Sequence, residues 1–165
     1  MSSSDRRRFL KAAGAFGAAV LGGCGFELRR SLAMPFSSIA LQGFAPRSPM
    51  AEQLRQGLKG VQVLDVPVQA DVVLRALNEE RVKVVSGTTT ASQVNNFSLR
   101  LRFKFRVETP AGRELIGASE LELSRDMSYS ETQALAKEYE ENDLYRAMQA
   151  DIAEQVLRRL AAIRL

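Results

Sequence analysis

The sequence predicts an α+β fold with about four mostly antiparallel strands, two helices packed on one face of the sheet, and a cleaved signal segment before them. Apolar and polar residues alternate over residues 97–107, which is typical of a half-buried strand. Apolar residues recur at helical spacing over residues 144–163, which indicates an amphipathic helix. The 165 residues are enough for one domain with a substantial core.

Residues 1–23 predict an export signal rather than a part of the fold. Residues 6–11 (Arg-Arg-Arg-Phe-Leu-Lys) resemble the twin-arginine pattern of bacterial signals. The uncharged Ala- and Gly-rich run that follows is too short to be a permanent membrane span. Export by the general secretory route and a retained basic amphipathic helix remain as alternatives.

The signal ends in Leu-Gly-Gly-Cys at residues 21–24, which resembles the lipobox of bacterial lipoproteins. Small residues let a signal peptidase reach the backbone, and the cysteine thiol then carries the lipid. We therefore expect cleavage before Cys24, lipidation of Cys24, and a single mature domain over residues 24–165. Gly25 in place of aspartate predicts, by the sorting rule of such lipoproteins, release to the outer membrane with the domain on its periplasmic side.

Composition excludes several classes of function. The sequence has no histidine and one cysteine, which excludes His-based triads, the usual zinc sites and an internal disulfide. We therefore expect no enzyme activity, no cofactor and no metal. The whole chain carries a formal +4, but residues 1–23 hold four basic residues and one acidic residue, which leaves +1 for the mature chain. A nearly neutral chain gives no reason to expect nucleic-acid binding.

The first elements of the mature chain are a strand and a short helix. Residues 38–41 are the expected first strand. Ser48 and Pro49 predict a helix start, because serine caps helices and proline suits the first turn. Apolar spacing gives this helix about twelve residues, and Gly60 suits its end. Residues 61–66 are expected to form a strand or a loop.

Residues 71–85 predict the second strand. Glu79-Glu80 interrupts its alternation, so we expect a bulge or bend at that point. Residues 86–92 then form a polar tip that contains no charged residue.

Residues 97–107 and 114–124 predict an antiparallel hairpin. A three-residue loop with Gly112 in the left-handed position matches the faces of both strands. The expected pairs are Val107 with Leu115, Leu101 with Leu121, Leu99 with Leu123, Arg102 with Glu120, and Arg100 with Glu122. Lys104 and Arg106 have no carboxylate opposite them in this register. The basic row is thus either a solvated strand face or an anion-binding surface.

The C-terminal segment predicts a long helix. Ser130 and Gln133 have capping-box spacing at its start. Its apolar stripe is expected to pack on the sheet: Leu144, Met148, Ile152, Ala153, Val156, Leu157, Leu160, Ala161 and Ile163. Glu154 and Arg158 are expected to form an exposed i,i+4 pair.

The mature chain begins Cys-Gly-Phe-Glu-Leu-Arg at residues 24–29. Near its end stand Ser-Arg-Asp-Met-Ser-Tyr-Ser at residues 124–130, Ala-Leu-Ala-Lys-Glu at 134–138 and Glu-Gln-Val-Leu-Arg-Arg-Leu at 154–160. These segments resemble the LptE (RlpB) family of lipopolysaccharide-assembly lipoproteins, and the whole mature chain follows its element order. The resemblance implies a two-helix, four-strand fold, an outer-membrane anchor, a place as plug and assembly partner inside the LptD β-barrel, and lipopolysaccharide binding.

The resemblance also implies a lipopolysaccharide-binding residue. A lysine of the Ala-Leu-Ala-Lys motif serves this role in the family, and Lys137 matches it; the alternative is an exposed lysine paired with Glu141. The family also uses a basic residue at the tip between the second and third strands, where this sequence has Thr88-Thr89-Thr90. Lys104 and Arg106 are candidate substitutes for that missing cation.

Two other functions remain open from the sequence. A periplasmic lipoprotein hydrolase would need a nucleophile, yet the sequence has neither a histidine nor a Gly-x-Ser-x-Gly elbow. A generic periplasm-facing envelope lipoprotein, serving as a scaffold for another lipid or protein, would have the same fold.

Overall fold

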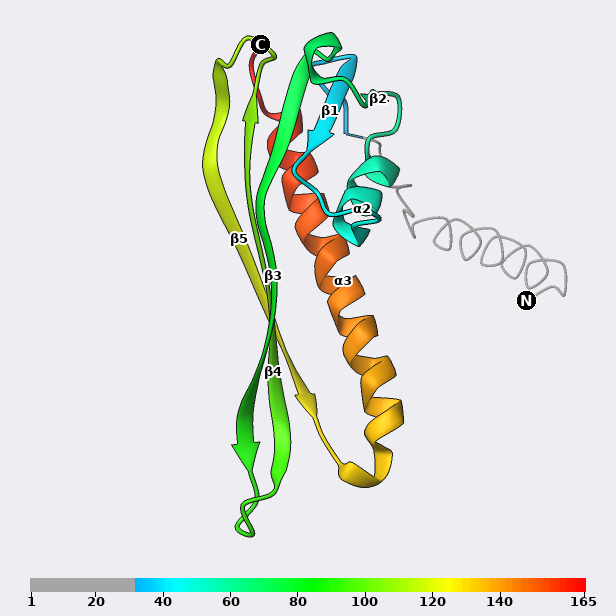
Figure 1. Cartoon of the computed structure of the whole chain (residues 1–165), viewed down its shortest axis with the longest axis vertical. Helices are drawn as coiled ribbons and strands as arrows, with labels where there is room; N and C mark the ends of the chain where they lie inside the picture. The colour runs from blue at the N-terminus through cyan, green and yellow to red at the C-terminus, as the bar shows by residue number, and fades with distance from the viewer. Residues whose placement is uncertain (1–31) are drawn as a thin grey trace, which may run out of the picture. The chain divides into compact units, whose positions relative to one another are not determined.

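The computed structural model describes residues 32–165, which form a five-stranded sheet with two helices on one face (Figure 1). The strands are β1 (Ser38–Gln42), β2 (Gln62–Leu64), β3 (Val72–Thr88), β4 (Val94–Glu108) and β5 (Glu114–Ser128), in the order β2-β1-β3-β4-β5. The helices are α2 (Pro49–Gly57) and α3 (Ala134–Ala161), with short 3₁₀ turns η1 (Pro67–Gln69) and η2 (Glu131–Gln133). The expected α+β class is confirmed, and β2 is a fifth strand where the sequence left strand or loop open.

The two short strands join the sheet in parallel, whereas the three long strands are antiparallel. Asp71 holds β1 against the start of β3, because its carboxylate accepts the backbone N–H groups of Ser37 at 3.0 Å and Ser38 at 2.9 Å. These bonds, led by that of Ser37, lower the pKa of Asp71. The carboxylate therefore stays ionised, and continues to accept both hydrogen bonds, at pH values below the ordinary pKa range of aspartate.

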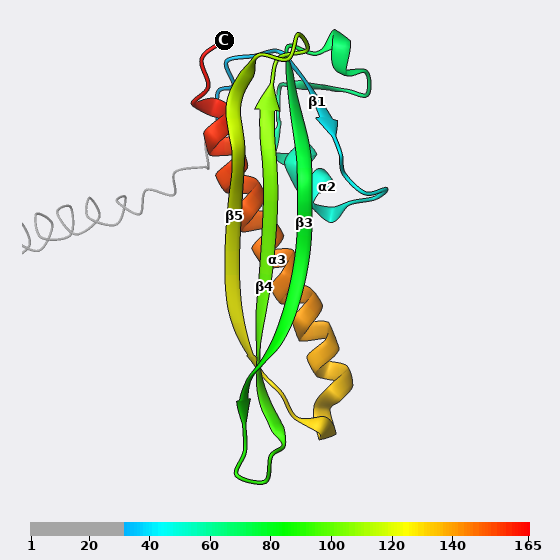
Figure 2. The ribbon, with the colours of Figure 1, turned by 60° about the vertical axis from the view of Figure 1, so that its left-hand side comes forward.

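The strands β3, β4 and β5 make a long twisted ribbon with two distinct ends (Figures 1 and 2). We call one the tip end, which holds the turn between β3 and β4 and the start of α3. The other is the C-terminal end, which holds η1, the turn between β4 and β5, and Leu165. At about 3.3 Å per residue the 17-residue β3 is about 55 Å long.

The core lies between β4 and α3. The alternation predicted for residues 97–107 is confirmed, since Leu99, Leu101, Phe103, Phe105 and Val107 are fully buried. The predicted helix stripe is confirmed as well: Met148, Ile152, Val156 and Leu160 are fully buried, and Ala153, Leu157 and Ile163 nearly so. The i,i+4 pair of Glu154 and Arg158 forms, with N and O 2.8 Å apart.

Helix α2 begins as predicted, but the start of α3 does not. Ser48 Oγ accepts the N–H of Ala51 at 3.2 Å, with Pro49 in the first turn. The helix has nine residues, fewer than the twelve expected. The capping box predicted at Ser130 and Gln133 is wrong: Ser130 precedes η2, where its hydroxyl contacts Thr132 at 2.9 Å. The 3₁₀ turn therefore separates Ser130 from the first N–H groups of α3.

A half-buried polar cluster ties both helices to β3. Glu79 accepts hydrogen bonds from Ser48 Oγ at 3.2 Å and from Gln149 Nε2 at 2.9 Å. The irregularity of β3 nearest the predicted bulge lies between Ala76 and Asn78, so the predicted position at Glu79-Glu80 was wrong by about two residues. The bulge re-aims the strand, which places Glu79 on the helix side, opposite the core residue Phe103.

The turn between β4 and β5 is as predicted, but the register beyond it is not. Gly112 is left-handed at φ 86°, and Glu108 pairs with Glu114. Irregularities between Phe105 and Glu108 then shift the pairing by two residues. The observed pairs include Leu101 with Leu123, Phe103 with Leu121, Arg102 with Glu122, Lys104 with Glu120, and Arg100 with Ser124. A shift of two preserves the faces, which is why face matching did not detect it.

The signal boundaries and Cys24 lie outside the described residues. The start of the mature chain at residue 24 therefore remains a prediction from the sequence.

Candidate functional site

Lys137 lies at the tip end, where the first turns of α3 meet the end of β5. Its Nζ is 2.7 Å from Glu140 Oε2 and donates to Ser128 Oγ at 3.0 Å. Only 14% of the side chain is exposed. The alternative pairing with Glu141 is wrong, because Glu141 contacts Lys83 instead. Lys137 is thus a positioned cation with one carboxylate already beside it.

Lys83 provides a second cation at this end. Its Nζ lies 2.5 Å from Glu141 Oε2 and 4.4 Å from the centre of the Phe97 ring. One helical turn further, Tyr145 donates its hydroxyl hydrogen to the Val82 carbonyl at 3.0 Å. Burial raises the pKa of Tyr145, with a further increase from Glu141. These contacts fix α3 against the edge of β3 and leave Lys83 beside an aromatic face.

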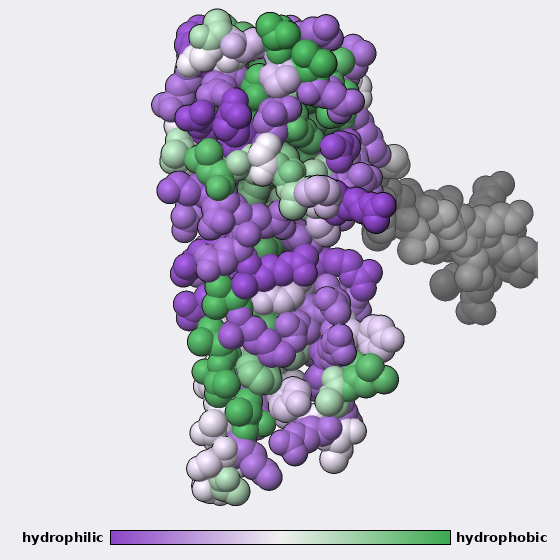
Figure 3. Space-filling model, in the orientation of Figure 1, coloured by the Kyte–Doolittle hydropathy of each residue, from purple (hydrophilic) through white to green (hydrophobic). Residues whose placement is uncertain are grey.

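Exposed apolar side chains flank these cations. Val85 on β3 is 51% exposed, and Leu135 and Tyr139 on α3 are 68% and 66% exposed, whereas Val84, 42% exposed, lies on the opposite face of the sheet. Figure 3 shows hydrophobic surface along the tip half of the β3–β4 hairpin and near the start of α3. Cations beside exposed apolar side chains suit an anionic amphiphile, which needs both kinds of contact.

The other two predicted binding residues lie elsewhere, and each has a carboxylate residue as a neighbour. Lys104 stands opposite Glu120 in the observed register, and Arg106 Nε is 3.2 Å from Glu108 Oε2. The expectation that no carboxylate lies opposite was wrong for Lys104, because it rested on the register that the irregularities displace; Arg106 has none opposite it and contacts Glu108 on its own strand. They lie on the sheet face away from the helices, and Lys104 is eight residues, or about 26 Å, along β4 from the end near Lys137. The three cations therefore do not form one site.

That outer sheet face carries ion pairs between side chains of neighbouring strands. Arg102 Nε lies 2.6 Å from Glu122, and its Nη1 is 3.8 Å from Glu80. The hydrogen bond and attraction from Glu122 raise the pKa of Arg102. Glu108 likewise accepts from Arg75 at 3.0 Å. Because Arg75, Arg102 and Arg106 already have carboxylates beside them, they are poor candidates for a phosphate site.

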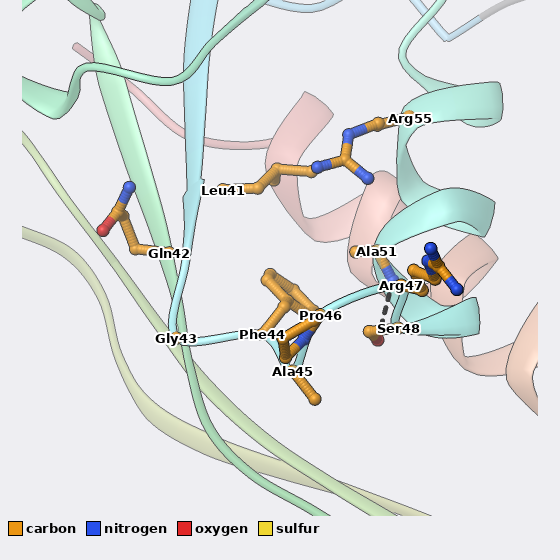
Figure 4. Close-up of a pocket in the computed structure, with 10 residues that line it drawn as sticks. All are labelled: Leu41, Gln42, Gly43, Phe44, Ala45, Pro46, Arg47, Ser48, Ala51 and Arg55. Carbon is orange, nitrogen blue, oxygen red and sulfur yellow. Dashed lines mark hydrogen bonds between the residues drawn. The ribbon is translucent and has the colours of Figure 1, made fainter.

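An open pocket of about 320 Å³ lies between β1 and α2 (Figure 4). Arg47 and Arg55 line it, and Figure 4 shows the Arg55 guanidinium extending from α2 toward Leu41. No sequence motif marks these arginines, which belong to a loop and a short helix. None of Lys104, Arg106 and Lys137 lines the pocket.

Comparison with known proteins decides the family. Residues 36–160 match the LptE family, whose description is lipopolysaccharide-assembly. The chain belongs to the LptE family. The match runs from just before β1 to the last turn of α3, so it includes the full sheet and both helices of this LptE domain.

Individual relatives agree with the LptE assignment. The LPS-assembly lipoprotein LptE of Yersinia enterocolitica is 28% identical over 153 residues, which cover 87% of this chain and 71% of that protein. The solution structure of an uncharacterized lipoprotein B from Nitrosomonas europaea has a TM-score of 0.70 at 26% identity, covering 84% of this chain and 91% of that one. Rare lipoprotein B from Shewanella oneidensis shares the fold, with a TM-score of 0.66 at 22% identity over 76% and 94% of the chains.

Within residues 32–165, none of the helices of this LptE-family chain combines the length and the apolar composition needed to cross a bilayer. The sequence interpretation missed two features of its tip end. The i,i+3 spacing of Lys137 and Glu140 in the sequence was enough to predict their pairing. The exposure of Val85 could not be predicted from the sequence, because it depends on where α3 stops covering the sheet.

Proposed function

We propose that this chain is an outer-membrane lipoprotein, anchored through Cys24 on the periplasmic side, that plugs the LptD β-barrel, assists its assembly and binds lipopolysaccharide. The observation that carries the proposal is the LptE family match over residues 36–160. The role is one of binding and scaffolding, without catalysis. Lipidation fits the Gly-Gly-Cys sequence before the domain, and several acyl chains anchor a protein far more firmly than one.

The form of the domain supports a place inside a barrel. It is a long, narrow two-layer ribbon, and the sheet face without helices carries the ion pairs of Arg102 and Glu108. The lumen wall of an outer-membrane barrel is polar, whereas its outside is apolar. A charged, balanced sheet face is therefore suited to the lumen side of such a wall.

Co-purification tests the partner directly. Membranes extracted in mild detergent should yield this lipoprotein in a stable complex with a large outer-membrane β-barrel. The same barrel should assemble poorly in cells that lack the lipoprotein. Recovery of the lipoprotein alone, together with normal barrel assembly in its absence, would contradict the proposed function.

Lys137 is the residue we propose for contact with lipopolysaccharide. Lipid A phosphates are anions that bind strongly to charged donors such as a lysine ammonium. Glu140 competes for the same ammonium at 2.7 Å, so a phosphate must displace or share that carboxylate. Val85, Leu135 and Tyr139 offer apolar surface at the same end for acyl chains. Lys104 and Arg106 remain secondary candidates, now less favourable because Lys104 lies opposite Glu120 and Arg106 contacts Glu108.

The Lys137→Glu variant should weaken lipopolysaccharide binding roughly tenfold, because it replaces an attraction to phosphate with a repulsion. Glu140→Gln should instead strengthen binding by about two- to threefold, since it removes the competing carboxylate from a partly exposed pair. Binding of purified variants to immobilised lipopolysaccharide measures both changes.

Arg146→Glu is the matched control for these variants. Arg146 lies on the same helix and pairs with Asp143 at the same i,i+3 spacing, but its side chain is 70% exposed and lies farther from the tip. Its change should leave lipopolysaccharide binding within about twofold of wild type. Equal losses for Lys137→Glu and Arg146→Glu would remove the specific role of Lys137 and indicate an effect of overall charge.

A further inference from the structure

The pocket between β1 and α2 has cations, but no carboxylate, among the described residues that line it. These residues come from the end of β1, the loop of residues 43–48 and the first turns of α2 (Figure 4). Arg47 and Arg55 are the charged ones. The candidate site at the tip end shares no residue with this lining, so the proposed contact with lipopolysaccharide leaves the pocket unexplained.

The two arginines of the pocket are poorly neutralised. Within residues 32–165, Arg47 forms no ion pair. Arg55 Nη1 lies 4.0 Å from Glu52 Oε2, and the two side chains are 49% and 59% exposed. Glu52 also accepts a hydrogen bond from Gln56 at 3.2 Å. An exposed pair at this distance contributes little, so both guanidinium groups remain able to bind an anion.

The loop that lines the pocket is held in place by the rest of the domain. The Phe44 ring stacks on Phe103 in the core, with 5.9 Å between ring centres. Ser48 donates its backbone N–H to the Ala45 carbonyl at 3.0 Å and its hydroxyl hydrogen to Glu79 on β3 at 3.2 Å. Because the loop is already ordered, a ligand would not have to order it on binding.

The backbone at Arg47 shows that the turn itself does not require an arginine. Arg47 has φ 59°, a left-handed conformation that glycine adopts with less strain. The side chain at this position therefore adds a guanidinium group to the pocket rather than stability to the turn. Leu41, Phe44 and Pro46 line the pocket on the side of β1 and the loop, across from α2 (Figure 4).

The charge and the size of the pocket indicate the class of ligand. Guanidinium groups bind carboxylates and phosphates through paired hydrogen bonds. Two of them match the charge of a phosphate monoester, about −1.5 to −2 at pH 7, better than that of a single carboxylate. The volume of about 320 Å³ corresponds to about ten waters at roughly 30 Å³ each. A bare phosphate would leave much of this space unfilled, so the ligand needs an organic part as well.

We propose that the pocket binds a phosphate monoester with a compact apolar body. Arg47 and Arg55 hold the phosphate, and Leu41, Phe44 and Pro46 contact the body. This site goes beyond the proposed function and does not depend on the tip end. The ligand is either a free organic phosphate or the head group of a lipid such as phosphatidic acid, which carries the same phosphate monoester.

Titration with phenyl phosphate tests the site. The mature lipoprotein is isotope-labelled and purified in a non-ionic detergent, and NMR follows its arginine side chains and the backbone of residues 43–48. The signals of Arg47 and Arg55 should shift saturably at millimolar or lower concentrations. Inorganic phosphate should bind at least about threefold more weakly, because it has no apolar body. Benzyl alcohol, which has no charge, should give no saturable shift at either arginine.

Arg55→Gln and Arg47→Gly should each weaken the binding of phenyl phosphate roughly tenfold, because each removes one charged donor. Glycine suits the left-handed turn, so Arg47→Gly keeps the loop and removes only the side chain. Arg146→Gln is the matched control: Arg146 also has a carboxylate three residues before it on a helix, but it does not line the pocket. Its binding should stay within about twofold of wild type. Unchanged signals from α3 and β4 show that the variants are folded.

Two short-chain lipids distinguish the sources of the phosphate. If dihexanoyl phosphatidic acid shifts the Arg47 and Arg55 signals at lower concentrations than phenyl phosphate does, and dihexanoyl phosphatidylcholine does not shift them, the ligand is a lipid head group. If phosphatidic acid binds no more tightly than phenyl phosphate, the ligand is a free organic phosphate. Both results support a phosphate monoester site.

The absence of saturable shifts at Arg47 and Arg55 would overturn the proposal, and so would equal losses for Arg146→Gln and the two pocket variants. Shifts confined to signals near Lys137 would place the phosphate at the tip end, which would overturn the pocket site and leave the proposed function intact. Lys137→Glu should leave the binding of phenyl phosphate in the pocket unchanged. Failure of Lys137 to bind lipopolysaccharide would therefore not affect the pocket site.

Discussion

Replacing Phe103 with alanine should lower the free energy of unfolding by about 3–5 kcal/mol, the largest loss expected from a single change in the core. Phe103 is fully buried in the middle of β4. Its ring stacks on Phe105 at 5.5 Å and on Phe44 at 5.9 Å, between ring centres. Alanine would remove both contacts and leave a cavity between the sheet and the helices. Urea denaturation of the purified domain, followed by circular dichroism, measures the change.

Lys104→Ala is the control for this variant. Lys104 is the next residue along β4, but it points to the opposite, exposed face of the sheet. Its removal should change the free energy of unfolding by less than about 0.5 kcal/mol. A comparable loss for both variants would mean that the β4 backbone, rather than packing beneath the helices, limits stability. A loss below about 1 kcal/mol for Phe103→Ala would show that the core collapses readily around the missing ring.

Local patterns predicted most of the fold. The alternation over residues 97–107, the Ser48-Pro49 start, the Gly112 turn and the apolar stripe of α3 each depend on neighbours in sequence. The register between β4 and β5 could not be predicted, because a two-residue shift leaves every side chain on the same face. The parallel pairing of β1 with β2 and β3 joins segments distant in sequence, and no periodicity in either segment reports it.

The candidate site was less predictable than the fold. Lys137 was named from a family motif, but its partners Ser128 and Glu140 depend on how the first turns of α3 meet β5. The error for Lys104 followed from the register error, because the residue of β5 opposite it is Glu120 rather than an uncharged one, whereas Arg106 contacts Glu108 two residues along its own strand. Which charged side chains lie opposite each other on two strands therefore depends on the strand register. The sequence alone leaves that register ambiguous by two residues.

Gly43 controls a close approach between two strands that no sequence pattern revealed. It has φ 79° at the point where β1 leaves β3, and a Cβ atom there would lie 2.3 Å from the Ala76 carbonyl oxygen. Gly43→Ala should therefore lower the free energy of unfolding by about 2–4 kcal/mol, through left-handed backbone strain together with displacement of β3 backbone. The chain reaches the cap of α2 at Ser48 five residues later, so the same change should loosen α2.

Gly60→Ala separates the two causes. Gly60 has nearly the same backbone angle, φ 83°, but a Cβ atom there would have no heavy atom within 4 Å. Gly60→Ala should therefore lower the free energy of unfolding only by the cost of the left-handed conformation, about 1–2 kcal/mol. The difference between the two variants in urea denaturation then measures the contact with Ala76, next to the irregularity where β3 changes course. Equal losses at Gly43 and Gly60 would mean that backbone conformation accounts for the whole effect and that β3 yields to the added methyl group.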